Sequence, residues 1–151
     1  MAMPNWDRWQ FLFGEWVGEG GGQQGQGGAT MLYQFDLQQQ ILLRSSHMDF
    51  TATEDQPAFA HDDLTVVYLD EVGIMRGRYY DNEGHIIQYV VSFPQDNDTI
   101  VFVSDPLPAA PRFRNTYLKG EAGKVTTRFE IAPPGSPDGF SVYVEGVVRR
   151  K

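Results

Sequence analysis

The feature that most constrains this chain is the regular spacing of its turn signals. From residue 15 onward, segments that alternate like β-strands are separated by short runs rich in Gly, Asp, Asn and Pro. Asp81–Gly84 and Gly120–Gly123 are typical hairpin loops. Because loops this short join strands that are neighbours in the sheet, the pattern predicts an up-and-down antiparallel sheet.

A short helix and a series of strands follow from this pattern. The helix is predicted over 5–13, with Asn5 as its N-cap and Gly14 as its stop. Ten strands are predicted, at 15–21, 29–37, 40–51, 62–70, 74–81, 85–93, 98–104, 112–119, 124–132 and 140–149.

The number of strands favours closure of the sheet. About ten strands in a single domain of 151 residues remove their exposed edges by forming a barrel. A two-sheet sandwich is the alternative, but it needs longer crossover connections than most of these loops provide. The predicted fold class is therefore all-β, an antiparallel up-and-down barrel over residues 1–151 with a short N-terminal helix.

Composition narrows the classes of partner. The formal net charge of −8 disfavours nucleic acid and anionic membranes, which are themselves negative. The chain has no cysteine, which excludes disulfides and thiolate metal sites. We find neither a secretory signal pattern nor a run of about 20 apolar residues, so we expect a soluble, cytoplasmic protein.

Polarity is mixed on both faces of several predicted strands, which indicates a barrel interior that is partly wet and large enough for a ligand. An inward arginine beside a tyrosine would bind a carboxylate, because the guanidinium pairs with both oxygens. Arg76 and Arg78 share a face with Tyr80, which makes this strand the first candidate. The alternative is that these arginines point outward. Further candidate lining residues, equally consistent with core packing, are Arg44, Tyr33, Tyr89 and Tyr117.

Other motifs carry weaker signals. Gly20–Gly25 matches G-x-G-x-x-G, but a strand follows it instead of a helix, so we interpret it as a flexible rim loop that can gate the pocket. His47 and Asp49 lie on one strand face and are either an acid–base pair or surface groups. His61 and His85 are expected to be exposed near turns. None of the histidines has metal-ligand spacing.

The segment Gly14-Glu-Trp16-Val-Gly18-Glu-Gly20 resembles the start of the nitrobindin-like and related bacterial lipocalin-like (calycin) barrels, many of unknown function. The resemblance in outline covers nearly the whole chain and implies a lipocalin or fatty-acid-binding-like barrel. It also implies that Trp16 packs at the closed end, beside Gly18 and an arginine of the last strand, Arg149 or Arg150. Nitrobindin-type haem binding uses a histidine near the C-terminus. Residues 143–150 contain none, so we expect no cofactor.

Three functions remain open at this point. The first is a binding module that holds a small hydrophobic or amphipathic molecule, with a carboxylate as one option for its polar group. The second is a barrel enzyme of the isomerase or decarboxylase type, and the third is a filled barrel that acts as a structural or interaction protein. The stiff loop at 106–111, followed by Phe113, is a plain connection, a lip over the pocket or a contact in a homodimer.

Overall fold

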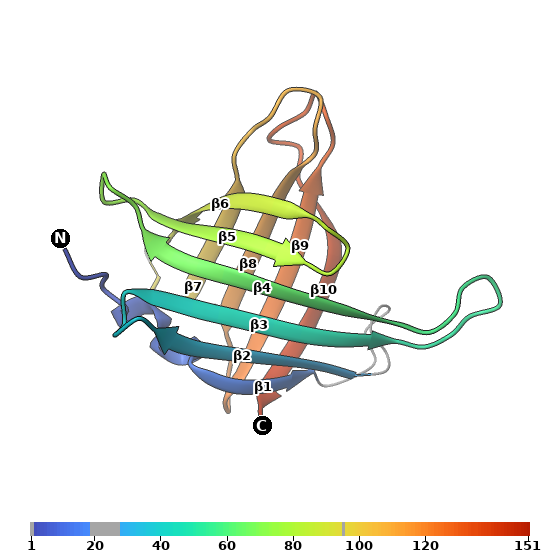
Figure 1. Cartoon of the computed structure of the whole chain (residues 1–151), viewed down its shortest axis with the longest axis horizontal. Coiled ribbons are helices and arrows are strands. Elements are labelled where there is room, and N and C mark those ends of the chain that lie inside the picture. Colours follow the sequence, from blue (N-terminus) through green and yellow to red (C-terminus); the bar gives the residue numbers. More distant parts are fainter. Residues whose placement is uncertain (1, 19–27, 95) are drawn as a thin grey trace.

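Ten antiparallel strands close into one barrel in the computed structural model, which describes residues 2–18, 28–94 and 96–151 (Figure 1). Each strand pairs with its neighbours in sequence, and β1 pairs with β10 to complete the ring. The predicted barrel is confirmed, and the sandwich alternative is wrong. The strands are β1 (Gly14–Gly18), β2 (Gly28–Asp36), β3 (Ile41–Phe50), β4 (Phe59–Leu69), β5 (Met75–Asp81), β6 (Ile86–Ser92), β7 (Thr99–Ser104), β8 (Arg112–Lys119), β9 (Lys124–Ala132) and β10 (Ser141–Arg150).

Most of the observed boundaries differ from the predicted ones by one to three residues, and two differences bear on the site. The helix is a 3-10 helix, η1 (Asp7–Leu12), whose N-cap is Trp6 and not the predicted Asn5. The Asn5 side chain still accepts a hydrogen bond from the Asp7 amide. Strand β4 begins at Phe59, three residues before the predicted start, and this difference decides where His61 points. The predicted rim loop at Gly20–Gly25 lies outside the described residues.

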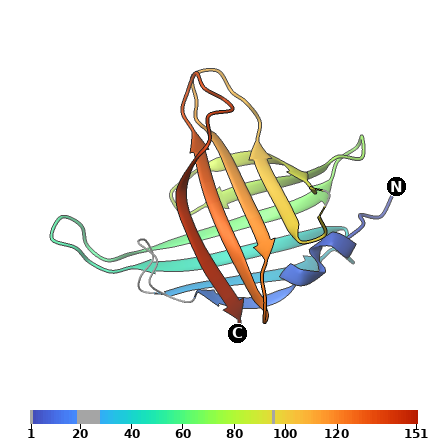
Figure 2. The same cartoon turned by 180° about the vertical axis from the view of Figure 1, so that it is seen from behind.

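The helix and the long β3–β4 hairpin mark opposite ends of the barrel. Figures 1 and 2 show η1 beside the chain reversals at one end of β2 and β3, while the hairpin at 51–58 projects beyond the other end. β7–β10 cross β2–β6 at a steep angle, behind them in Figure 1 and in front of them in Figure 2. This geometry places the inner faces of the two groups of strands opposite each other.

Strand register fixes which side chains face inward. Buried Trp16 pairs with Met31, and the same face of the sheet continues through the pair Tyr33 and Arg44. Because side chains alternate along a strand, every second residue from these positions faces the interior. Repeating this step around the ring assigns an inner and an outer face to all ten strands.

Aromatic and aliphatic side chains fill the interior at the helix end. Trp9 and Leu12 of η1 are fully buried, and Trp9 packs edge-on against Phe102 with ring centroids 5.7 Å apart. The indole of Trp16 donates a hydrogen bond to the Leu12 carbonyl at 2.8 Å. We call this packed half of the interior the closed half. Its buried residues include Trp6, Trp9, Leu12, Trp16, Leu42, Val67, Val91, Ile100, Phe102 and Val125.

An arginine from the last strand completes the closed half. The guanidinium of Arg150 lies 4.5 Å from the Trp16 ring centroid and donates hydrogen bonds to the Phe13 and Phe11 carbonyls. Arg149 pairs with Val17 on the outer face and is exposed, so of the two arginines considered from the sequence it is Arg150 that stacks on the indole. Gly18 also packs closely, since a Cβ there would lie 3.3 Å from the Ala29 Cβ.

Candidate functional site

Beyond the middle of the barrel, the inner face is more polar and more exposed than in the closed half. Toward the β3–β4 hairpin, polar and aromatic side chains alternate with a few aliphatic ones on the inner face, and all keep part of their surface exposed. We call this region the open half. Its inward residues include Ser46, Met48, His61, Asp63, Tyr79, Ile87, Phe113, Asn115, Thr127, Phe129 and Val144.

Arg44 lies where the two halves meet. Its side chain is 16% exposed, and Nη1 donates to Asp63 Oδ1 at 3.0 Å. Ser46 donates to the other oxygen of Asp63 at 2.6 Å. Burial alone would lower the pKa of Arg44, but Asp63, Tyr117 and Tyr33 outweigh it and raise that pKa, so the guanidinium stays charged.

The remaining donors of this arginine are poorly satisfied. Nη2 points to the thioether of Met31 at 3.7 Å, and sulfur is a weak acceptor. Nε is buried and has no hydrogen-bond partner among the described residues, and the same is true of the hydroxyl of Tyr33, the cross-strand neighbour of Arg44. Burial, followed by the nearby Tyr117, raises the pKa of Tyr33, so its phenol keeps its proton and is a donor. Tyr117 and Arg44 lie close enough to the Tyr33 hydroxyl to affect its pKa as hydrogen-bond partners would, but neither meets the hydroxyl or Arg44 Nε with good hydrogen-bond geometry. Two adjacent side chains therefore offer donors that lack a well-placed acceptor in the described chain.

A hydrogen-bonded chain runs from this cluster along the wall to the rim. His61 Nε2 lies 3.4 Å from Asp63 Oδ2 and 3.2 Å from the Tyr79 hydroxyl, which donates to Asp81 at 3.0 Å. Burial raises the pKa of Tyr79, as do Asp63 and Asp81. Burial also tends to raise the pKa of Asp81, but hydrogen bonds from His85, Tyr79 and the turn amides outweigh it and lower that pKa to about 2.

The opposite wall is apolar and leaves room. Phe113 and Phe129 stack with ring centroids 5.8 Å apart, and Val144 lies beside Phe129 on the same inner face. Gly146 follows on β10 at an inward position, and a Cβ built there would meet no heavy atom within 4 Å among the described residues. The described residues therefore leave open space around the Cβ position of Gly146, in contrast to the packed helix end.

Some of the predicted lining residues come together and others do not. Arg44, Tyr33, Tyr89 and Tyr117 share the inner face: the Arg44 guanidinium carbon is 5.9 Å from the Tyr117 ring centroid, and Asn115 donates to the Tyr89 hydroxyl. All four lie on the floor of the open half, where it meets the packed helix end.

The strand ranked first from the sequence turns its candidates the wrong way. Arg76, Arg78 and Tyr80 lie on the outer face of β5, because Gly77 between them packs inward against Phe102. Arg76 is bound to Asp70 of the adjacent turn at 2.7 Å, beside a surface groove of about 630 Å³. The prediction that these three line the pocket is wrong, and the outward alternative holds.

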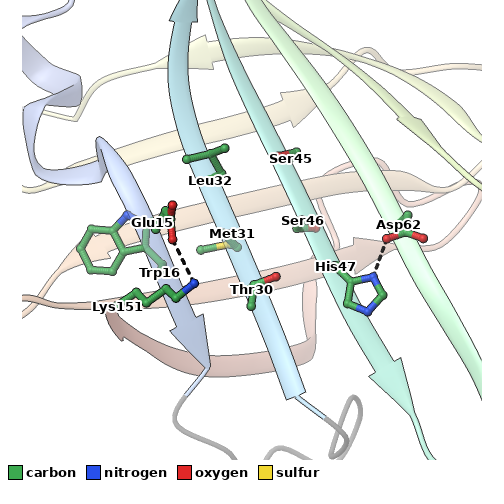
Figure 3. A pocket seen from close by; sticks show the side chains of 10 residues that line it. All are labelled: Glu15, Trp16, Thr30, Met31, Leu32, Ser45, Ser46, His47, Asp62 and Lys151. Atoms are coloured by element: carbon green, nitrogen blue, oxygen red, sulfur yellow. Dashed lines mark hydrogen bonds and ion pairs between the residues drawn. The ribbon is translucent and has the colours of Figure 1, made fainter.

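The pair His47 and Asp49 also lies outside the barrel. His47 lines a groove of about 380 Å³ on the outer face of β1–β4. Figure 3 shows its imidazole directed at Asp62. Its two ring nitrogens lie 2.6 Å from Asp62 and 3.0 Å from Asp49, and these hydrogen bonds, led by that to Asp62, raise its pKa. The His47 side chain is 45% exposed. An acid–base pair inside the barrel therefore cannot be built on His47 and Asp49.

Sequence reasoning missed the residues that form the polar wall. His61 was expected to be exposed near a turn, but β4 already begins at Phe59, so His61 points inward with Asp63. Alternation along Phe59, His61 and Asp63 toward Val67 was the available signal. This signal was missed because His61 and Asp63, which belong to the inner face, are themselves polar. His85 is exposed in its turn, as expected, where it contacts Asp81.

A scan against models of known protein families and a search of curated proteins both returned no match to this chain. The resemblance to nitrobindin-like barrels therefore stays a prediction. In the described ranges, no group of three or more His, Cys, Asp or Glu side chains is placed to hold a metal ion. Over the same ranges, no helix is long and apolar enough to cross a bilayer.

Proposed function

We propose that this protein binds a small amphipathic molecule in the open half of the barrel. The observation that carries the proposal is the pair of buried, unused donors on Tyr33 and Arg44 at the floor of a region that is still partly exposed. A buried polar group without a partner is costly, so such groups are typical of sites completed by a ligand.

The apolar wall and the polar wall of the open half match the apolar and polar parts of such a molecule. Its apolar part would lie along Phe129 and Val144 and use the space beside Gly146, while its polar end would reach Arg44. Ligand sites commonly combine an apolar lining with a few convergent polar groups. The closed half offers no comparable space, because Trp9 and Phe102 fill it.

The test fills that space with protein. In Gly146→Phe, a ring is added to the inner face of β10, and in the matched control Val147→Phe the same ring is added to the outer face. Binding of the neutral fluorophores Nile red and N-phenyl-1-naphthylamine is titrated for wild type and both variants, with melting temperature as the check on folding. We expect saturable binding that Gly146→Phe weakens at least tenfold and Val147→Phe leaves unchanged. Equal binding by both variants, or no saturable binding to wild type, would refute the proposal.

Acid–base catalysis in the same space is the second candidate function. It is favoured by the position of His61 between the Asp63 carboxylate and the Tyr79 hydroxyl, since converging titratable groups inside a cavity are the usual setting for proton transfer. The test is exchange of hydrogens α to a carbonyl in deuterated water, followed by NMR over a panel of small ketones. Catalysed exchange that disappears in His61→Asn supports this function, and no exchange above the buffer rate rules it out for these ketones.

A further inference from the structure

The guanidinium of Arg44 already has its counter-ion. Asp63, whose side chain is 8% exposed, accepts from Arg44 through one oxygen and from Ser46 through the other. The pair is close to neutral as a unit. An anionic ligand at Arg44 would therefore have to approach a carboxylate that shares the same guanidinium, in a region where water screens charge poorly.

Other charges on the path to Arg44 are also negative. Asp81, 3% exposed and held ionised by its turn, lies on the same wall. Among the described inward-facing strand residues of the open half, Arg44 is the only arginine or lysine. The connections at this end (51–58, 82–85, 105–111 and 133–140) contain no lysine or arginine. Their acidic residues are Glu54, Asp55, Glu83, Asp105 and Asp138. Asp105 and Asp138 have arginine partners in Arg76 and Arg112, so the repulsion of anions at the entrance rests mainly on Glu54, Asp55 and Glu83.

What the cluster lacks is an acceptor atom. Arg44 Nε and the Tyr33 hydroxyl have no acceptor within the described chain, and Arg44 Nη2 has only the Met31 sulfur. Each oxygen of Asp81 already accepts two hydrogen bonds, and Asp63 Oδ2 accepts from Ser46 with His61 3.4 Å away. For the donors of an ammonium ligand these carboxylates leave one lone pair, on Asp63 Oδ1, which is already paired with Arg44.

We infer that the polar end of the ligand is an uncharged hydrogen-bond acceptor, such as a ketone or amide carbonyl, which takes the place of the Met31 sulfur beside Arg44 and Tyr33. This inference rests on the proposed binding function and names its ligand class. An uncharged acceptor satisfies the unused donors and leaves the balance between Arg44 and Asp63 undisturbed.

The experiment compares three ligands that share one alkyl chain. N,N-dimethyldecanamide, decanoate and decyltrimethylammonium are titrated against wild type at pH 7.5 by displacement of Nile red, below their aggregation concentrations. We expect the amide to bind at least tenfold more tightly than either ion. Equal affinity of the three, or tighter binding of decanoate or of the cation, would overturn the inference. The binding function itself would still be judged by Gly146→Phe.

Two variants separate head-group recognition from structural effects. Tyr33→Phe removes one unused donor and leaves its ring in place, so we expect it to weaken the amide several-fold without weakening decanoate. Asp63→Asn removes the counter-ion of Arg44, and we expect decanoate binding to strengthen at least tenfold relative to the amide. If Asp63→Asn does not fold, Tyr33→Phe still decides the inference. Unchanged amide affinity in that variant would contradict it.

Discussion

The two halves of the barrel interior use the same strands for different purposes. In the closed half, η1 places Trp9 and Leu12 against Phe102, and the indole of Trp16 is held between Leu12 and Arg150. In the open half, the same alternation exposes part of Asp63 and Phe129, and space remains beside Gly146. The closed half therefore provides most of the stability, and the open half is free to carry polar groups that a packed core would not tolerate.

Truncation of one aromatic ring in each half gives the largest expected contrast. Trp9→Ala should lower the free energy of unfolding by about 3–5 kcal/mol, because a fully buried ring leaves a cavity. Phe129→Ala should cost roughly half as much, since its ring is already partly exposed. Urea unfolding at pH 7 measures both. Equal losses would mean that the open half is as tightly packed as the closed half.

Substitution of two inward-facing glycines compares the packing of the two halves through smaller changes in the free energy of unfolding. In Gly77→Ala, the new Cβ would lie 2.8 Å from Phe102 Cε2, so we expect a loss of about 1–3 kcal/mol from overpacking. Gly146→Ala meets open space and should be neutral or slightly stabilising, because it restricts the unfolded chain. The same unfolding assay compares them, and a similar cost for both would remove the argument for space beside Gly146.

Acid should affect the open half through Asp81. Its pKa is lowered from near 4 to about 2, so its ionised form stabilises the fold above pH 4, and this contribution is lost as the pH falls from 4 to 2. We expect the contribution to be about 1–2 kcal/mol. Asp81→Asn should therefore lose stability at pH 7 but be close to wild type at pH 2.

The measurement is urea unfolding of wild type and Asp81→Asn at several values between pH 2 and pH 7. The difference between the two proteins isolates Asp81 from other carboxyl groups whose pKa values are also lowered, such as Asp70 and Glu130. A difference that does not change with pH would show that the turn hydrogen bonds do not depend on the charge of Asp81.

The architecture could be predicted from the sequence because it depends on local signals. Alternation and turn residues mark each strand, and short loops require neighbouring strands to pair. The order and closure of the sheet follow from these two rules. This is why the ten strands could be predicted with errors of only a few residues, whereas the placement of Trp16 at the closed end came from the family resemblance.

The candidate site could be predicted only in part, because it depends on which face of a strand is buried. Both faces of β5 carry a tyrosine, and what decides between them is Phe102, a residue of β7 that fills the space left by Gly77. No pattern within β5 contains that information. The ion pair between Arg44 and Asp63 could not be predicted either, because it depends on the register between β3 and β4.

The seam between β1 and β10 has a consequence for how the barrel assembles. Nine of the ten strand pairings join strands that are consecutive in the sequence, but Trp16 pairs with Arg150 across almost the whole chain. Loop-closure entropy opposes such a distant contact until the intervening hairpins have formed. We therefore expect the β1–β10 pairing to form last, so that the sheet has two free edges, at which copies of the chain can pair, until this seam closes.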